Sequence, residues 1–351
     1  MTEIDRLRPA YQADLAGGLD RFFEPRASAC PWCSSERLSV RLRTRDFLQH
    51  KPGRFTLDQC QDCAHIFQNP RLNPAGLEFY YRDFYDGLGE KQLAGQFEGR
   101  GKTYLGRAEA VSGAVSGVTK PSNWLDVGTG HGHFCESARE VFPETRFDGL
   151  DLSEGVKLAE EHGRVSTGYR GLFVELADEL ADRYDVVSMY HYLEHSTAPQ
   201  AELDAAHRVL RAGGHLVIEV PDPESRYARL LGRRWLPWLQ PQHLHFVPLA
   251  NLRQRLEAQG FTVVLEQRAE AHDPIDLVAA AWLTLDDLAP REDAPWHPRS
   301  PGRFRRIARG GVLLAGALGV VLAAVADRLV RPFAGRARLS NAYRMVARKD
   351  S

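Results

Sequence analysis

The 351-residue chain has little excess charge, few cysteines and no long hydrophobic run near its start. Its 45 lysines and arginines nearly balance 46 aspartates and glutamates, for a formal net charge of −1. This balance argues against a dedicated nucleic-acid binder, which usually carries a basic excess. The first 23 residues lack a continuous apolar core, so we expect no secretory signal there. Five cysteines are too few for a disulfide scaffold. The composition predicts a cytoplasmic globular protein.

Four of the five cysteines fall in two C-x-x-C pairs, and this spacing predicts a zinc site. Cys30 and Cys33 form the first pair, and Cys60 and Cys63 form the second pair 26 residues further on. Four thiolates in such pairs can surround one zinc ion tetrahedrally. Because sulfur fills all four positions, none is open for a substrate, and the predicted role is structural. The alternatives are reduced cysteines without metal and a redox pair.

Strand and helix patterns divide the chain into four zones. These are a zinc-binding module at 24–70, a helical lead-in at 71–120, an α/β domain at 121–269 and 341–351, and a helical insertion at 270–340. Within the α/β domain, strand and helix patterns alternate, which is typical of a parallel sheet. The predicted strands are at 123–128, 146–151, 184–190, 214–220 and 261–267, with a final strand at 341–349. Two of the intervening helices are expected to stop at glycines, Gly214 and Gly260.

One segment of the insertion differs from an ordinary soluble sequence. Residues 310–326 are uncharged and rich in glycine and alanine, with basic stretches on both sides. Their 17 residues lie at the lower limit for a membrane-spanning helix. Three interpretations are open: a helix buried in the protein or at a homodimer interface, peripheral membrane attachment through the basic flanks, and a true span.

A glycine occupies every second position in the loop of WLDVGTGHGHF, residues 124–134. Glycines let the chain turn sharply and bring a ligand against bare backbone at a helix N-terminus. A dinucleotide fingerprint needs G-x-G-x-x-G, but His133 or Cys135 occupies the third glycine position in either frame. A phosphate loop ending in G-K-[ST] is also absent from this stretch. The loop therefore predicts another kind of cofactor.

The pattern D-x-G-x-G-x-G in this stretch resembles motif I of class I S-adenosylmethionine-dependent methyltransferases. The resemblance implies that the loop packs against the methionine and ribose part of the cofactor and that Asp126 helps to position its amino group. It also implies a second acid at the end of the next strand, on the ribose hydroxyls, and Asp151 occupies that position. No residue of 164–180 matches the acid that many relatives place at the adenine. The implied cofactor-binding residues are Asp126, Gly128, Thr129, Gly130, Gly132, Asp151 and Leu152.

Two further stretches carry the resemblance. PQHLHF at 241–246 is similar to an element that borders the acceptor pocket in a large methyltransferase subfamily. The text that begins at Cys60 resembles the zinc module ahead of the methyltransferase domain in sugar C-methyltransferases. The resemblance covers residues 30–268 and fails beyond them, because those enzymes carry a further C-terminal domain. It implies a small-molecule acceptor such as a sugar, a nucleotide-sugar or a secondary-metabolite intermediate.

Three histidines are candidate bases for the proton that methylation displaces: His243, His195 and His191, in that order. Open α/β sheets bind ligands at the carboxyl ends of their strands, and histidine can take up a proton near neutral pH. A structural histidine bonded to backbone is the alternative for each. Arg233 and Arg234 are candidates for holding an acidic group of the acceptor, and solvated arginines are the alternative.

The run from His191 through Glu194 to His195 also matches H-x-x-E-H, an inverted zinc-peptidase signature, which predicts a metallohydrolase. Such histidines need one continuous helix, whereas this segment leaves a strand and soon meets Pro199.

We therefore favour a Rossmann-like, seven-stranded α/β methyltransferase sheet with an N-terminal zinc-knuckle module and a helical insertion before the last strand. The predicted activity is methyl transfer from S-adenosylmethionine to a small molecule. A scaffold or sensor that binds this cofactor without methyl transfer is the alternative.

Overall fold

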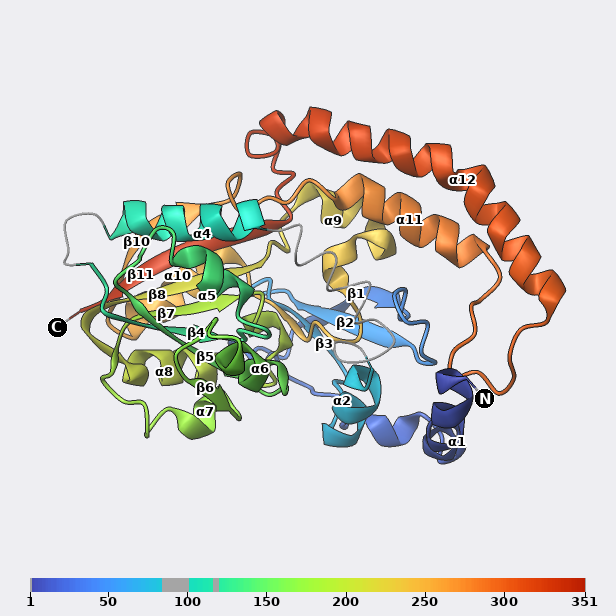
Figure 1. Cartoon of the computed structure of the whole chain (residues 1–351), viewed down its shortest axis with the longest axis horizontal. Coiled ribbons are helices and arrows are strands. Elements are labelled where there is room, and N and C mark those ends of the chain that lie inside the picture. The colour runs from blue at the N-terminus through green and yellow to red at the C-terminus, as the bar shows by residue number, and fades with distance from the viewer. Residues whose placement is uncertain (1, 84–100, 116–119, 351) are drawn as a thin grey trace. The chain divides into compact units, whose positions relative to one another are not determined.

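The computed structural model describes residues 2–83, 101–115 and 120–350 (Figure 1). Contacts divide them into two compact units. Unit 1 takes its described residues from 1–87, 223–244 and 272–341, and unit 2 takes its described residues from 88–222, 245–271 and 342–351. Unit 1 thus unites segments that the sequence assigns to the zinc module and to the helical insertion. The four-zone division itself stays a prediction.

Unit 2 is built on a seven-stranded sheet with the order β10-β11-β8-β7-β4-β5-β6. Its strands are β4 (Asn123–Val127), β5 (Arg146–Asp151), β6 (Gly168–Arg170), β7 (Tyr184–Tyr190), β8 (Leu210–Pro221), β10 (Phe261–Gln267) and β11 (Ala342–Lys349). The strands from β8 to β6 are parallel, and β11 is antiparallel to both of its neighbours. The predicted Rossmann-like sheet is confirmed, including the return of the chain's last segment as a strand.

Helices connect these strands, as the alternating pattern predicts. They are α4 (Gly101–Ala114), α5 (His133–Ala138), α6 (Gly155–Glu161), α7 (Phe173–Leu176), α8 (Pro199–Val209) and α10 (Leu249–Ala258), with a 3-10 turn η2 (Leu193–His195) after β7. Trp124 of β4 is fully buried, and its ring meets Phe142 edge-on at 5.3 Å between centroids. The indole Nε1–H donates to Ser188 Oγ at 2.8 Å, which satisfies the polar atom inside the core.

Two local predictions fail for identifiable reasons. The helix expected to stop at Gly214 ends at Val209, because the chain enters β8 at Leu210. Gly213, with φ of +75°, therefore lies inside the strand and does not cap a helix. The three-residue β6 is too short to produce a periodic pattern and was not predicted. By contrast, Gly260 follows α10 with φ of +83°, as expected of a glycine helix stop.

Unit 1 combines a small sheet with several helices. Its main elements are α1 (Glu3–Ala16), β1 (Leu38–Thr44), β2 (Phe55–Cys60), β3 (Ile66–Gln68), α2 (Pro74–Tyr81), α9 (Arg226–Leu230), α11 (Asp276–Leu288) and α12 (Arg303–Val330). Strands β1, β2 and β3 pair antiparallel in chain order. Asn73 starts α2, where its side chain accepts from Gly76 N at 2.9 Å and Pro74 occupies the first turn. An aromatic cluster that includes Tyr11, Phe79 and Trp296 forms the core.

Helix α12 runs along α11 (Figure 1) and is fastened to it by polar contacts near both ends. Arg309 donates to Asp286 at 2.5 Å. Asp327 accepts the backbone N–H groups of Leu277 and Val278 at 3.0 and 2.8 Å, which caps the start of α11. A Cβ added to Gly316 would overlap Leu285, so glycine permits the close approach between the helices.

Apart from these contacts, most of α12 is exposed to solvent. Among the described residues, Arg303–Phe333 is the one helical stretch long and apolar enough to cross a membrane, by length and composition only. Only 6% of the most apolar part of this helix is buried. The interpretation of 310–326 as a helix buried within this chain is therefore wrong.

The Asp327→Ala variant should unfold with a free energy about 1 kcal/mol lower than the native chain, because two N–H groups at the start of α11 lose their acceptor. Urea unfolding followed by tryptophan fluorescence measures the difference. The matched control is Arg328→Ala, since Arg328 is the exposed neighbour on the same helix. Equal loss in the two variants would contradict the capping role.

Candidate active site

The glycine loop after β4 contains three glycines in the left-handed region, with φ of +78° at Gly128, +53° at Gly130 and +76° at Gly132. A Cβ at Gly128 would lie 2.8 Å from the Tyr192 ring, and one at Gly132 would lie 3.0 Å from the Cβ of Ala159. A Cβ at Gly130 would meet nothing within 4 Å. Two of the glycines therefore permit close packing, while Gly130 leaves bare backbone beside open space.

Asp151 ends β5 and holds this loop in place. Its Oδ2 accepts the backbone N–H of Gly130 at 2.9 Å, and its Oδ1 accepts that of Ser153 at 2.8 Å. A carboxylate oxygen can accept more than one hydrogen bond, so both oxygens retain capacity for ligand hydroxyls. Thr129 is buried within the loop, and Leu152 is 61% exposed. The structure thus brings together the glycine loop and the second acid, as the spacing predicts.

Asp126 lies inside the sheet. Ser188 Oγ donates to its Oδ1 at 2.5 Å, and the Cys135 thiol lies 3.9 Å from its Oδ2. Burial raises the pKa of Asp126 to about 6, and the hydrogen bond from Ser188 acts against that rise. The carboxyl is therefore mostly ionised at neutral pH, although it is only 4% exposed. The two predicted acids differ in setting, because Asp126 is enclosed by protein and Asp151 is partly exposed.

A buried charge cluster lies beside this site in unit 2. Glu219 of β8 is 2% exposed and accepts Arg107 Nε on Oε1 at 2.9 Å and Arg344 Nε on Oε2 at 2.8 Å. Arg344 lies directly opposite Glu219 in the β8–β11 ladder. Burial opposes ionisation, but the charge of Arg107 foremost outweighs it and holds the pKa of Glu219 well below its usual range. The sequence patterns do not predict this cluster. Its sign in the sequence is a charged residue, Glu219 or Arg344, within each of two mostly apolar strands.

His191 joins this cluster from the end of β7. Its φ of +53° is uncommon for a residue other than glycine. Nδ1 lies 3.1 Å from Glu194 Oε1, and Nε2 lies 3.4 Å from Glu219 Oε1. Burial opposes the charge on the ring, but the hydrogen bonds with Glu194 and Glu219 outweigh it and raise the pKa of His191 to about 9. The ring is therefore cationic at neutral pH, which suits a positioning role better than that of a base.

The other two histidines occupy different settings. His195 ends the three-residue turn η2, and its N–H donates to Tyr192 O at 2.9 Å. His191 lies outside this turn, so the continuous helix that the metallohydrolase alternative requires is missing. His243 belongs to unit 1 and is buried, with Nδ1 2.7 Å from the carbonyl oxygen of Pro237. Nδ1 must carry the hydrogen of that bond, so in the neutral ring Nε2 is the nitrogen that can accept a proton.

The tryptophans and arginines near His243 are mainly structural. Trp235 and Trp238 are buried in unit 1, with their rings edge to face at 4.9 Å. Arg234 forms an ion pair with Asp287 at 2.6 Å, so its charge is already balanced by an acidic residue of the same unit. Arg233 is exposed. Of the two arginines considered for holding an acidic acceptor, Arg233 is the one whose side chain faces solvent.

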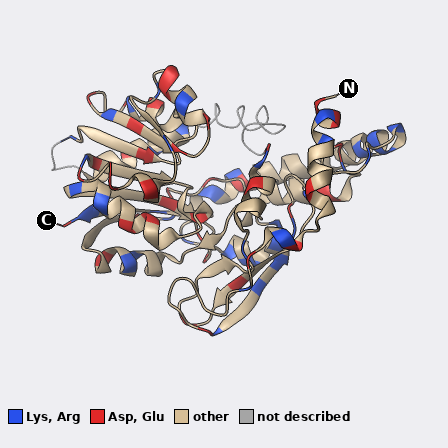
Figure 2. Cartoon of the chain, turned by 90° about the horizontal axis from the view of Figure 1, so that it is seen from below, with Lys and Arg blue, Asp and Glu red and all other residues tan. Residues whose placement is uncertain are grey.

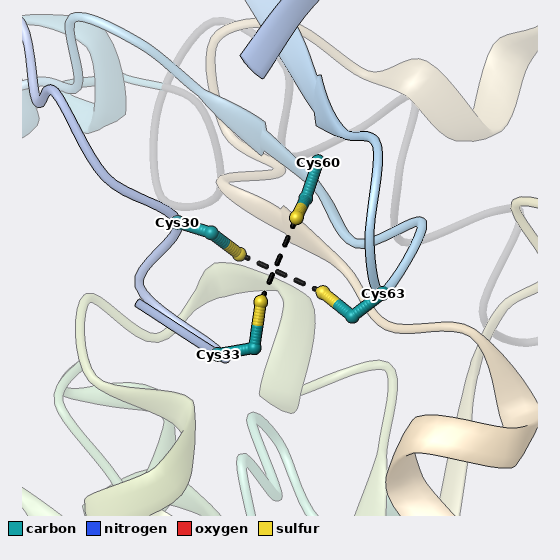
Figure 3. Close-up of side chains that lie close together, drawn as sticks. All are labelled: Cys30, Cys33, Cys60 and Cys63. Carbon is teal, nitrogen blue, oxygen red and sulfur yellow. Dashed lines mark hydrogen bonds between the residues drawn. The ribbon is translucent and has the colours of Figure 1, made fainter. Parts of the chain in front are cut away.

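The four cysteines of the C-x-x-C pairs converge in unit 1 (Figure 3). The sulfur atoms of Cys30 and Cys63 are 3.7 Å apart, those of Cys33 and Cys60 are 3.6 Å apart, and all four lie within 4.8 Å of one another. Zinc–sulfur bonds of about 2.3 Å in a tetrahedron require sulfur separations of about 3.8 Å. The donor set and its spacing therefore fit one zinc ion, as the sequence predicts.

Backbone groups of the second knuckle assist ionisation of one thiol. Burial works against the charge on Cys60, but hydrogen bonds from the N–H groups of Cys63 and Asp62 outweigh it and lower the pKa of the thiol to about 7. Burial raises the pKa of the Cys30 thiol to about 11 and that of Cys63 above its usual range, so zinc, which binds thiolates, would displace protons from these two thiols.

Comparison with known proteins gives a consistent result. A family model described as a methyltransferase domain matches residues 106–266. The ubiquinone biosynthesis O-methyltransferase of Alkalilimnicola ehrlichii is 32% identical over 128 residues, which cover 34% of this chain and 51% of the relative. The enzyme of the same name from Bordetella avium is 31% identical over 138 residues, or 37% of this chain and 56% of the relative. The chain spans about half the length of these relatives.

Solved structures are similar at a more distant level. A SAM-dependent methyltransferase from Archaeoglobus fulgidus has 19% identity and a TM-score of 0.46, over 74% of this chain and 99% of the other. A putative sarcosine dimethylglycine methyltransferase from Galdieria sulphuraria has 18% identity and a TM-score of 0.43, over 71% of this chain and 84% of the other.

The charge on His191 should be visible in its titration. We expect the ring to titrate with a pKa near 9, measured by the NMR shift of its carbon-bound protons. Since the folded pKa lies above the ordinary value of 6.5, the stabilisation is complete below pH 6.5 and is lost as the pH rises through 9. His191→Gln should therefore cost stability at pH 6 and cost progressively less toward pH 10.

The internal control is His207, whose pKa burial lowers from 6.5. It should titrate below His191 in the same spectrum. A His191 pKa at or below that of His207 would rule out the cationic cluster.

Proposed function

We propose that this chain, in which residues 106–266 match a methyltransferase-domain family model, is a class I S-adenosylmethionine-dependent methyltransferase that acts on a small-molecule acceptor. The observation that carries the proposal is the glycine loop tied to Asp151 at the end of β5. The relatives named for O-methylation in ubiquinone biosynthesis support a small organic acceptor. A sugar, a nucleotide-sugar and a secondary-metabolite intermediate are the acceptor classes that we propose.

The residues around the loop fit S-adenosylmethionine. The open space beside Gly130 can take the cofactor against bare backbone, and the Asp151 oxygens can accept both ribose hydroxyls. Thr129, Gly132 and Leu152 would complete the contact around the loop. The bound cofactor supplies a methyl group already activated by the positive sulfur.

The chain's own contribution is mainly positioning. The chain would hold the acceptor with its lone pair directed at the methyl carbon, opposite the carbon–sulfur bond whose electron pair would pass to sulfur. The proton that the acceptor loses needs a base. His243 remains our first candidate for this base. Its Nδ1 donates to the Pro237 carbonyl, which leaves Nε2 of the neutral ring as the nitrogen that can accept a proton. His195 is the second candidate. His191 comes last because its ring is already charged, so we assign it to holding the loop after β7.

Calorimetric titration with S-adenosylhomocysteine tests the cofactor assignment. The native chain should bind it and not NADH, and Asp151→Ala should weaken binding at least tenfold, about 1.4 kcal/mol. The matched control is Asp178→Ala, which removes an equal charge from an exposed site of unit 2. Affinity that is unchanged in Asp151→Ala would contradict the role of this carboxylate.

A second experiment tests whether the chain is an enzyme or a scaffold or sensor that binds the cofactor without methyl transfer. The native chain, incubated with methyl-tritiated S-adenosylmethionine and a small-molecule extract, should move label to an acceptor and release an equal amount of S-adenosylhomocysteine. Tight cofactor binding without transfer to any fraction would favour the scaffold. A reaction without the protein reports label that moves without the enzyme, and Asp151→Ala should transfer less label than the native chain.

We also propose that Cys30, Cys33, Cys60 and Cys63 hold one structural zinc ion. Four sulfur ligands complete a tetrahedral shell, so the ion would stabilise unit 1 and would not contact substrate. The buried apolar cluster at the knuckles contains Cys30, Cys60 and Phe67, and a metal that joins the two knuckles would compensate for this small cluster.

Metal analysis of the purified chain should find one zinc per chain. Cys60→Ser should lose the zinc and lower the unfolding temperature. Cys135→Ala is the control, because Cys135 is buried in unit 2 and belongs to no knuckle. No zinc in the native chain, or zinc retained in Cys60→Ser, would overturn the assignment, and a second zinc ion per chain would revive the metallohydrolase alternative.

We propose a cytoplasmic location and no nucleic-acid partner. Figure 2 displays acidic and basic residues interspersed along many of the strands and helices. The near-zero net charge of the chain supports the same conclusion.

A further inference from the structure

We propose that α12 lies in the plane of an anionic phospholipid bilayer and binds it through its outward apolar face. This inference goes beyond methyl transfer and holds whatever the acceptor is. It rests on three features of the described residues: which side of α12 is exposed, where the arginines lie, and how β11 returns to the sheet.

The outward face of α12 is a continuous apolar stripe. Eight large apolar side chains recur at helical spacing with between 45% and 88% of their surface exposed. They are Phe304, Ile307, Leu314, Leu318, Val321, Leu322, Val325 and Leu329. Soluble proteins rarely expose contiguous apolar surface on this scale, and such patches mark a binding partner. A helix of 28 residues extends about 42 Å, so the stripe is long enough for a broad contact.

The opposite side of α12 is already occupied. Arg309 donates to Asp286, Gly316 lies against Leu285, and Asp327 caps the start of α11. An isolated amphipathic helix would turn its polar side to water, but here α11 covers that side. The apolar stripe therefore keeps one orientation and faces away from α11.

Charge around α12 complements an anionic surface. Residues 294–341 contain nine arginines and a single acid, Asp327, which is 2% exposed. Since the whole chain has a formal net charge of −1 and this segment has +8, the rest of the chain carries −9. Arg303, Arg305 and Arg306 lie at the start of the stripe and are exposed. Arg328 lies near its other end, Arg331, Arg336 and Arg338 follow the helix, and all four are exposed. Basic residues beside an apolar helical face strengthen binding to anionic lipids.

The sheet of unit 2 excludes a single crossing of the membrane. β8 and β10 precede α12 in the chain, β11 follows it, and β11 pairs with both of them. The two ends of α12 must therefore lie on the same side of a bilayer. A return crossing by α11 would need about 20 apolar residues, and α11 has 13. The remaining geometry is a helix that lies in the membrane surface.

A second copy of the chain is a weaker candidate for the same face. In a symmetric dimer, each apolar stripe would meet its equal, and the two basic segments would approach each other. Like charges brought together across an interface oppose association. An anionic bilayer can bury the apolar stripe and also pair its headgroups with the arginines, whereas a dimer would bury only the stripe.

Vesicle flotation tests the proposal on the full chain. The native protein should float with vesicles of phosphatidylcholine and phosphatidylglycerol and float less with phosphatidylcholine alone. Leu314→Glu combined with Leu318→Glu should reduce binding to anionic vesicles at least tenfold. Val264→Glu, at an exposed apolar position of β10, should leave binding unchanged. Arg303→Gln with Arg305→Gln and Arg306→Gln should remove most of the preference for anionic vesicles.

Zinc content and circular dichroism establish that each variant is folded. Sedimentation velocity without lipid detects a dimer. The proposal is overturned if the native protein does not bind vesicles. It is also overturned if the double glutamate variant binds them as well as the native chain does. A native dimer that the double variant converts to monomer, without vesicle binding, assigns the face to a second copy. S-adenosylhomocysteine titration of the same proteins distinguishes a failed docking proposal from a failed cofactor assignment.

Discussion

The insertion of β11 between β8 and β10 is the constraint on which much of the structure depends. This strand comes after the whole α11–α12 excursion, yet its apolar residues, among them Tyr343 and Val346, are fully buried. Its Arg344 pairs with Glu219, which also binds Arg107 and faces His191. Loss of the Glu219 carboxylate would leave two buried arginines without their shared partner, a change that costs several kcal/mol in comparable ion pairs. The same strand fixes both ends of α12 to one side of any membrane.

The cofactor loop was predictable because its signal is local. Three glycines at every second position require backbone that other residues avoid, and the structure gives each of them a positive φ. Their roles differ in a manner that spacing alone could not reveal. Gly128 and Gly132 admit the Tyr192 ring and Ala159, whereas Gly130 adjoins open space. Likewise, the two C-x-x-C pairs predict that four sulfur atoms converge, and the structure places all four within 4.8 Å of one another.

The unpredicted features share a non-local origin. The three-residue β6 has no period to detect, and α8 ends at Val209 because β8 begins there, not because a glycine intervenes. The cluster around Glu219 depends on the register between β8 and β11, which lie far apart in the sequence. The charge on His191 follows from that cluster, so the order of the candidate bases could not be deduced from residue type. Composition also could not show whether 310–326 faces protein, because an apolar helix has the same sequence pattern in a core and on a lipid surface.

The outward residues of α12 are informative because folding does not require them. Gly316 and polar groups near both helix ends contact α11, whereas Leu314 and Leu318 are mostly exposed and contribute little to packing within the chain. Glutamate or lysine would serve helix formation there nearly as well as leucine and would improve solubility. Large apolar side chains at 68% and 79% exposure therefore carry a cost in water that an external partner must offset. The basic flanks and the sheet that bars a crossing indicate that this partner is the surface of an anionic bilayer.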